Sequence, residues 1–486
     1  MKNLAILCIA LLLNIACTAD EPRHLATGIK IGEVTASEAI VWVRLTGNAE
    51  RIDFGAPMPI VSYTLASTGE PLETVRSRQR DAVPSVEFPD GSSIDTIEGA
   101  APGATGVARV HFRPEADEEL RVTGWQKVDP DADFTSQFQL SDLQPGSRYV
   151  VRVEYGASRY GKRDFMDGSF RTAPAPDEAA PVPFTVTTGQ RYPNRDTDKG
   201  FRIYEQLLKL DPDFFVHTGD ILYFDQLGKT PALANWHWQR TYSLENLVEF
   251  HRNVASYFIK DDHDTLQDDA WPTMETTFMG DMTFDDGIRI FLDQVPMGDK
   301  TYRTVRWGKD LQIWLVEGRD YRSANTMDDG PDKTIWGAEQ MAWFKRTVQE
   351  SDATFRVLIS PTPVVGPDRT TKRDNHSNSA FAYEGNLLRE FIASQDNMVV
   401  VCGDRHWQYV SVDQVHGVKE YSSGPASDKH AGGWSNDKVL PEHEYLNVIG
   451  GFLAVTVERE DGQPVLVARH YGVGGSILHE DRVPAE

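Results

Sequence analysis

The sequence has few cysteines, no excess of positive charge and one sizeable apolar run, and each of these limits what the protein can be. Three cysteines in 486 residues cannot brace a disulfide scaffold. The 49 Lys and Arg residues are outnumbered by 73 Asp and Glu residues, which gives a formal charge of −24. That charge repels nucleic-acid phosphates, so we expect no binding to duplex nucleic acid. At about 100–200 residues per domain, the chain has room for two or three domains.

The apolar run lies at the start of the chain and is typical of an export signal. Residues 4–16 follow Lys2 and are too few to cross a hydrocarbon core of about 30 Å. Residues 1–19 are therefore predicted to be a signal peptide, and the protein to be periplasmic or on the cell surface. Two outcomes stay open: Cys17 becomes the lipidated first residue of a lipoprotein, or cleavage near Ala19 releases the protein. Lipid at Cys17 would be the only membrane attachment that we expect, and the sequence leaves the oligomeric state open.

The rest of the chain divides into two parts with different patterns of apolar and polar residues. Short runs of alternating apolar and polar residues with turn-rich connections predict an all-β sandwich of the immunoglobulin or fibronectin type over residues 24–174. A proline-rich stretch, residues 175–183, is predicted to be a linker. From residue 184 to residue 480, strands alternate with helical patterns, which predicts an α/β domain.

Acidic and imidazole side chains follow three apolar strands of this second half. Asp220 follows a predicted strand and Gly219, the run 261–264 reads Asp-Asp-His-Asp after a second strand, and Asp404 and His406 follow a third. Because the carboxyl ends of strands in an open α/β sheet meet at one edge, we expect these groups to gather. On the residues alone they fit either a binuclear metal site for phosphoryl chemistry or structural Ca²⁺ sites.

The motifs resemble, in their order, those of PhoD-type alkaline phosphatases and phosphodiesterases of the calcineurin-like metallophosphatase superfamily. The similar stretches are residues 27–44, 143–149, 168–174, 212–223, 261–264, 317–322, 337–344 and 403–406. The resemblance implies a catalytic domain over residues 184–480 with a β-sandwich flanked by helices in four layers. The all-β domain would precede it.

The resemblance also implies roles for individual residues. Asp220 would bridge two metals, Tyr223 would ligate one of them, Asp262 and Asp404 would hold the other, and His406 would complete the cluster. The family often binds Ca²⁺ at the second position and Fe³⁺ beside the tyrosine, with Mn²⁺ or Zn²⁺ as alternatives here. His263 would be the catalytic residue that contacts the scissile phosphate.

One position departs from the family pattern. The first strand of the family's catalytic domain normally ends with a cysteine ligand, and the corresponding position here is Gly189. The soft thiolate is therefore absent, which weakens the case for Fe³⁺ beside Tyr223. Gln190 or a water molecule could fill the gap, or one metal could be lost.

Further residues have a functional and a structural interpretation. Arg373, Asn375 and His376 lie in a basic loop that, with Arg405, could bind an anionic substrate, or the loop could be solvated surface. Trp236, Trp238 and Trp271 could line a cleft, although packing is the commoner role of tryptophan. Arg319 is expected to form a structural ion pair behind the site.

The sequence thus predicts an exported metal-dependent phosphohydrolase that uses metal-activated hydroxide on a small or polymeric phosphomonoester or phosphodiester. Two alternatives remain. One is a hydrolase on the same scaffold that acts on another ester of a polysaccharide or lipid. The other is a non-catalytic surface binding protein with structural metals.

Overall fold

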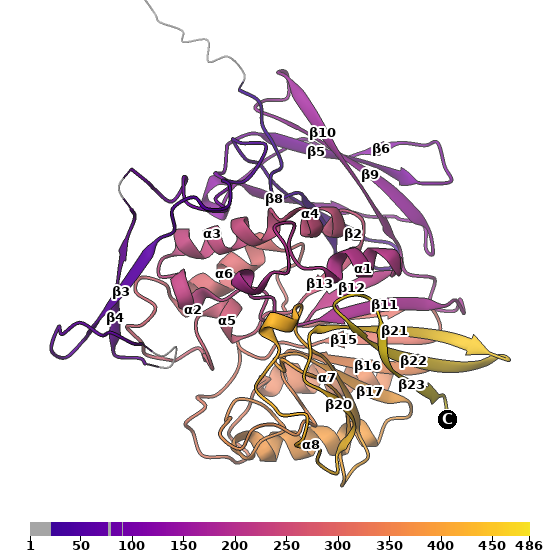
Figure 1. Ribbon diagram of the computed structural model, residues 1–486. Coiled ribbons are helices and arrows are strands. Elements are labelled where there is room, and N and C mark those ends of the chain that lie inside the picture. The colour runs from indigo at the N-terminus through magenta and orange to yellow at the C-terminus, as the bar shows by residue number, and fades with distance from the viewer. Residues whose placement is uncertain (1–20, 76–78, 90) are drawn as a thin grey trace, which may run out of the picture.

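The computed structural model describes residues 21–75, 79–89 and 91–486, and the predicted signal peptide lies outside this part of the chain. Two large sheets form the body of the molecule, and a smaller N-terminal sheet and a long hairpin lie beside them (Figure 1). The fold is a mixed α/β fold rich in sheet, as predicted from the strand patterns of the first half and the alternating strand and helix patterns of the second.

The first large sheet has nine strands and combines both ends of the chain. At its centre β11, β12 and β13 run parallel to one another. From one edge to the other the strands are β23 (Ile477–Pro484), β22 (Gln463–Gly472), β21 (Gly451–Glu460), β11 (Val182–Thr187), β12 (Phe214–His217), β13 (Ala255–Phe258), β1 (Ile29–Gly32), β2 (Ala39–Arg44) and β8 (Thr135–Leu140).

The second large sheet has seven strands and packs face to face against the first. Phe214 of β12 packs on Trp307 of β14, with ring centroids 4.6 Å apart, and both belong to one continuous core. The strand order is β14 (Arg303–Trp307), β15 (Leu311–Leu315), β16 (Phe355–Ser360), β17 (Met398–Cys402), β19 (Lys419–Ser423), β18 (Gln408–Val412) and β20 (His443–Asn447).

Helices cover the outer face of each large sheet, which is the face turned away from the other sheet. Successive residues of a strand point to opposite faces, so each strand contributes side chains both to the core between the sheets and to the contact with the helices. Phe214 and Val216 face the second sheet, whereas Phe215 packs among helices α1 (Ile203–Lys209), α3 (Pro231–Tyr242), α4 (Glu245–His251) and α6 (Phe284–Gln294). On the other sheet, Leu358 and Val400 pack against α7 (Gly337–Glu350) and α8 (Ala382–Ala393). The order is therefore helix, sheet, sheet, helix.

The N-terminal region is built of strands. A smaller sheet places β5 (Val107–Pro114) between β9 (Arg148–Gly156) and the short strands β6 (Arg121–Val122) and β7 (Gln126–Lys127), with β10 (Arg163–Arg171) outside β9. In the described part of residues 24–174 the one helical element is the 3-10 turn η1 (Pro130–Ala132). The cores of this sheet and of strands β2 and β8 are continuous, through residues such as Val110, Val41 and Phe138.

The two halves of the chain share a sheet. Gly32 of β1 pairs in parallel with Ser256 of β13, so the N-terminal strands extend the central sheet of the second half. Strand β11 begins at Val182, inside the range predicted as the linker. The boundaries at residues 174 and 183 therefore stay predictions.

The hairpin of β3 (Ile60–Leu65) and β4 (Ala82–Glu87) leaves the N-terminal region and approaches the helices near α2 (Phe224–Leu227) (Figure 1). Its Tyr63 stacks on Phe278, with ring centroids 5.4 Å apart. Among the described helices, none has the length and apolar character needed to cross a membrane.

Candidate active site

The ends of three neighbouring strands and one strand of the facing sheet meet at one place. The parallel strands β11, β12 and β13 lead into Gly189, Asp220 and Asp262, respectively. Strand β17 leads into Asp404, whose backbone N–H donates to the Thr188 hydroxyl at 3.2 Å. The groups therefore gather as the sequence predicts, except that Asp404 comes from the facing sheet and not from the edge that Asp220 and Asp262 share.

Tight turns aim the side chains at this place. Gly219 has a φ of +103°, and a Cβ there would lie 2.6 Å from the Cβ of Asp261, so glycine lets the ends of β12 and β13 approach. Asp220 and Asp404 both have positive φ, 53° and 60°, which few residues other than glycine, asparagine and aspartate tolerate. Both aspartates thus occupy the sharp turns that follow strands β12 and β17.

Helix α5 (Asp262–Thr265) presents the Asp-Asp-His-Asp run. Asp261 and Asp264 form a capping box that fixes the first turn. The Oδ2 atom of Asp262 accepts from the backbone N–H of Asp269 at 2.6 Å. The cap leaves Asp262 and His263 to face the strand ends, and ligand atoms of Asp220, Asp262 and His263 all lie within 4.8 Å of one another.

A second group of atoms converges beside Asp220. The Tyr223 hydroxyl lies 3.1 Å from Asp220 Oδ2, 3.2 Å from His406 Nε2 and 2.8 Å from His430 Nε2. His406 Nε2 is also 3.2 Å from Asp220 Oδ2 and 3.2 Å from His430 Nε2. The structure therefore brings the predicted Asp220, Tyr223 and His406 together and adds His430, which the sequence analysis missed.

Asp404 reaches the same cavity from the facing sheet. The cavity has a volume of about 390 Å³, and its lining includes the predicted residues Asp220, Asp262, His263, Asp404 and His406. Asp404 forms an ion pair with Arg405. Four of the five predicted metal ligands, Asp220, Asp262, Asp404 and His406, thus line one cavity, and the fifth, Tyr223, lines a neighbouring hollow and contacts Asp220.

Burying several carboxylates at one site is unfavourable unless nearby positive charges or metal ions stabilise them. Burial raises the pKa of Asp220 to about 7, and the neighbouring Asp262 adds to the effect. Burial also acts to raise the pKa of Asp262, but the charges of Arg319 and His263 outweigh it and hold that pKa below its usual range. Asp220 Oδ1 is buried and has no hydrogen-bond partner among the described residues. An unpaired buried carboxylate oxygen beside imidazole and phenol groups is a donor set that fits metal ions.

Two contacts hold His263 in place. Its Nδ1 atom lies 3.3 Å from Asp225 Oδ2, and its ring lies on that of Tyr223, with centroids 4.4 Å apart. Burial acts to lower the pKa of His263, but the charges of Asp225, Asp262 and Asp220 outweigh it and raise that pKa well above its usual value. These carboxylates favour the protonated imidazole, the form that can donate a proton.

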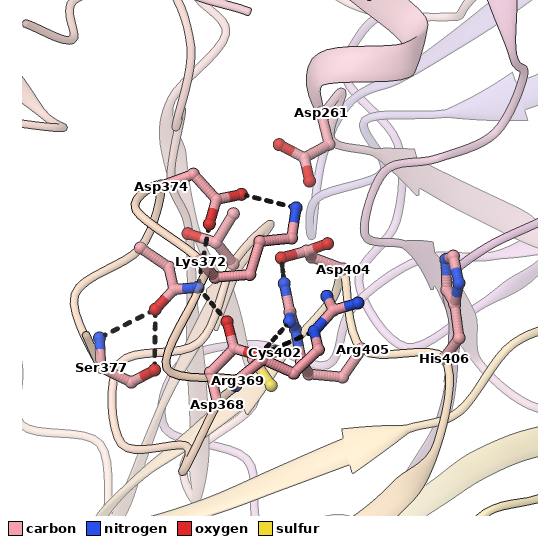
Figure 2. Close-up of polar contacts among 12 residues, drawn as sticks. Asp261, Asp368, Arg369, Lys372, Asp374, Ser377, Cys402, Asp404, Arg405 and His406 are labelled. Atoms are coloured by element: carbon pink, nitrogen blue, oxygen red, sulfur yellow. Dashed lines mark hydrogen bonds and ion pairs between the residues drawn. The ribbon is translucent and has the colours of Figure 1, made fainter. Parts of the chain in front are cut away.

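Most of the predicted substrate-binding residues are turned away from the cavity. Arg405 is fully buried and lies 2.5 Å from Asp368 (Figure 2). Asn375 is also fully buried and donates to Asp368 at 2.8 Å. His376 is buried against Trp336, and its Nε2 atom lies 2.9 Å from Glu384. Each of these three side chains thus pairs with a carboxylate of the protein, so none of them is available to an anionic substrate in the way the sequence suggested.

The basic loop still contributes charge to the cavity. Lys372 and Arg369 line it, and Lys372 Nζ lies 2.7 Å from Asp269 and 3.4 Å from Asp374. Figure 2 shows both side chains reaching toward Asp404, with His406 standing apart from the loop. Arg373 is exposed and lines a smaller neighbouring hollow of about 170 Å³, so its predicted substrate contact remains a prediction.

The three tryptophans that could line a cleft do not all have the same role. Trp236 and Trp238 lie in helix α3 and are fully buried, so packing is their role. Trp271 is also buried but lines the hollow that contains Arg373. The side-chain oxygen of Gln190, a candidate to fill the gap at Gly189, accepts a hydrogen bond from Tyr204 of helix α1.

The pair of Asp225 and His263 leads to a testable prediction. Asp225→Asn keeps the size of the side chain but removes the charge that holds the imidazolium, and loss of such an orienting partner costs about 10- to 100-fold. We expect kcat to fall by about that factor, with KM and metal content little changed. Steady-state kinetics and elemental analysis check this.

His263→Ala provides the control for this prediction. In that background Asp225→Asn should have no further effect, because Asp225 acts through the imidazole. An additional loss of rate in the double variant, or loss of metal in Asp225→Asn, would contradict the assignment.

Face-to-face sheets with helices outside, and acidic, phenolic and imidazole side chains at the strand ends, define the class of metallophosphatase-like proteins. The family profile of the PhoD-like phosphatases matches residues 184–438, which is more than half of the chain. The chain therefore belongs to the PhoD-like phosphatase family, and the resemblance predicted from its motifs is confirmed. Its membership supports a metal-dependent phosphoric ester hydrolase.

Solved structures share this fold at low sequence identity. The structure of PhoD matches 96% of this chain and 89% of its own, with 15% identity and a TM-score of 0.70. Purple acid phosphatase PPD1 from yellow lupin (Lupinus luteus) seeds matches 96% of this chain and 74% of its own, with 11% identity and a TM-score of 0.59. No curated protein sequence matches the chain.

Proposed function

We propose that the protein is an exported metal-dependent phosphohydrolase that cleaves phosphomonoesters or phosphodiesters. The observation that carries the proposal is the convergence of Asp220, Asp262, Asp404 and His406 on one cavity, in a chain that belongs to the PhoD-like phosphatase family. Export rests on the signal-like residues 1–19, with attachment through a lipid on Cys17 as one outcome and release as the other.

The residues present fit two metal positions that share Asp220. Tyr223 and His406 would hold one metal, and Asp262 and Asp404 the other, with Ca²⁺ suited to the oxygen-rich second position and Fe³⁺, Mn²⁺ or Zn²⁺ to the first. When bound, the metals would supply a nucleophile from water near neutral pH and stabilise negative charge at phosphorus.

The protein's own side chains would orient the substrate. Lys372 and Arg369 place positive charge on the cavity wall, which draws an anion into an otherwise acidic protein. The protonated His263 would donate to a phosphoryl oxygen and then give its proton to the leaving oxygen. Asp225 and Tyr223 fix the orientation of that imidazole.

The leaving group would lie toward the hairpin of β3 and β4. A second hollow of about 450 Å³ shares His263 and His430 with the cavity, and its lining includes Tyr63 of the hairpin. We infer that the N-terminal strands are an immunoglobulin- or fibronectin-like sandwich that supports this hairpin. The sandwich would then contribute to the choice of ester.

A substrate panel on the purified protein tests the proposal. We expect hydrolysis of aryl phosphomonoesters or phosphodiesters that a chelator abolishes and re-added metal restores, together with metal in the elemental analysis. Aryl sulfates and carboxylic esters are the matched controls. Activity on those controls alone would favour a different hydrolase, and retained metal without hydrolysis of any ester would favour a binding protein.

A further inference from the structure

The missing thiolate leaves a defined gap in the cluster around Asp220. Gly189 follows strand β11 with a φ of +58°. A Cβ at this position would lie 3.0 Å from His406 Cδ2 and 3.2 Å from His406 Nε2. A side chain here would therefore point at the imidazole of His406, which is the place from which the family's cysteine is expected to bind.

His430 approaches the same atoms from another part of the chain. It is the last residue of the 3-10 turn η4 (Asp428–His430), which follows strand β19. Its Nε2 atom lies 2.8 Å from the Tyr223 hydroxyl and 3.2 Å from His406 Nε2. A nitrogen donor thus stands beside the atoms that the cysteine would have faced.

The spacing of the four atoms fits one shared ion. Their five measured separations, among Asp220 Oδ2, the Tyr223 hydroxyl oxygen and the two Nε2 atoms, run from 2.8 to 3.2 Å. Ligand atoms about 2.1 Å from one ion lie about 3.0 Å apart at right angles and about 3.4 Å apart at tetrahedral angles. The phenol has a single proton, so it can donate to only one of Asp220, His406 and His430.

The outer contacts of His430 prepare Nε2 to act as a ligand. Its Nδ1 atom lies 3.2 Å from Asn194 Oδ1. The Asn194 amide nitrogen donates to the carbonyl of Lys429 at 3.1 Å, so the amide oxygen is left to accept from His430. Nδ1 then carries the proton and Nε2 presents its lone pair, the arrangement usual for metal-ligating histidines.

We propose that His430 replaces the absent cysteine as a ligand of the metal that Asp220, Tyr223 and His406 would hold. The inference rests on the proposed function, since it presupposes the binuclear site. It adds a residue outside the strand-end motifs and explains how this chain tolerates glycine at position 189. The resulting set contains one carboxylate, one phenolate and two imidazoles, with no sulfur.

Titration of the metal-free full-length protein with Co²⁺ tests the assignment without relying on turnover. We expect two Co²⁺ ions per wild-type chain, with visible absorption from the site that contains Tyr223. His430→Ala should still bind one ion with wild-type affinity. Its affinity for the other ion should fall by more than about 10- to 100-fold, which is the loss expected when only an outer hydrogen-bond partner of a ligand is removed. Its Co²⁺ spectrum should also change. His430→Gln has similar bulk and decides the same question if the alanine variant does not fold.

His416→Ala, at a histidine in the loop between β18 and β19, is the matched control and should bind Co²⁺ as the wild type does. Two ions of unchanged affinity and spectrum in both His430 variants would overturn the assignment. So would loss of turnover with metal binding intact, because His430 would then contact substrate alone. Absence of Co²⁺ binding by the wild-type protein would instead count against the proposed function itself.

Discussion

Asp220→Asn is expected to lower hydrolysis of phosphate esters by at least about 10³-fold and to remove at least one metal from the protein. Asp220 is the residue that both proposed metal positions share, and its Oδ1 atom has no other partner among the described residues. An amide carries no negative charge and cannot bridge two cations as a carboxylate does. Because Asn also tolerates the positive φ of 53°, the turn itself should persist.

Metal content by elemental analysis and kcat/KM on an aryl phosphate are the measurements. Asp461→Asn is the matched control, because Asp461 is an exposed aspartate with a φ of 49° in the turn between β21 and β22. The control should retain wild-type rate and metal. Wild-type rates in Asp220→Asn would remove Asp220 from the mechanism and with it the proposed site.

The strand-end aspartates could be predicted from the sequence because their placement follows from topology. Each of Asp220, Asp262 and Asp404 comes shortly after an apolar strand, and the parallel neighbours β12 and β13 bring Asp220 and Asp262 to one edge. Asp404 follows a strand of the facing sheet, whose approach this pattern does not specify. Their neighbours Gly219 and Gly403 mark the sharp turns. The local pattern therefore identified all three aspartates, although it specified the common edge only for Asp220 and Asp262.

His430 could not be found in this way. It lies in the 3-10 turn η4, and nothing in the neighbouring sequence specifies that this turn contacts Tyr223, which lies 207 positions earlier in the chain. The only sequence signal is an acidic residue and a histidine in Asp428-Lys-His430, followed by Gly432-Gly433. Such a signal identifies a turn and leaves its destination unspecified.

The basic loop shows a different limit. Their polar character indicated that Asn375, His376 and Arg405 could meet a substrate, yet each is buried and pairs with a carboxylate, Asp368 or Glu384. The sequence shows which residues are charged but does not show which of them form pairs in the folded protein. The same holds for the N-terminal half, where alternation predicted strands but not that β1 would join the sheet of the second half.

Arg319→Met is expected to lower the free energy of unfolding by about 3–5 kcal/mol, the cost of leaving buried charges without their partner. Arg319 is fully buried; its Nε donates to Asp261 at 2.5 Å, and its Nη2 lies 3.8 Å from both Asp262 and Asp374. This agrees with the structural ion pair predicted behind the site. Burial has already raised the pKa of Asp261 to about 7 despite this arginine. Methionine fills much of the volume, so the loss would come from charge.

Denaturant unfolding of the metal-free protein measures the effect without the contribution of bound ions. Arg346→Met is the matched control: Arg346 pairs with Glu350 on the exposed face of helix α7, and such pairs contribute about 0–1 kcal/mol. Arg319→Lys should fall between the two, because an ammonium group keeps the charge but cannot reproduce the planar fork between three carboxylates. Equal stability of Arg319→Met and Arg346→Met would mean that Asp261, Asp262 and Asp374 become hydrated or protonated at little cost in free energy. The carboxylate cluster would then not depend on Arg319 for its place beside the cavity.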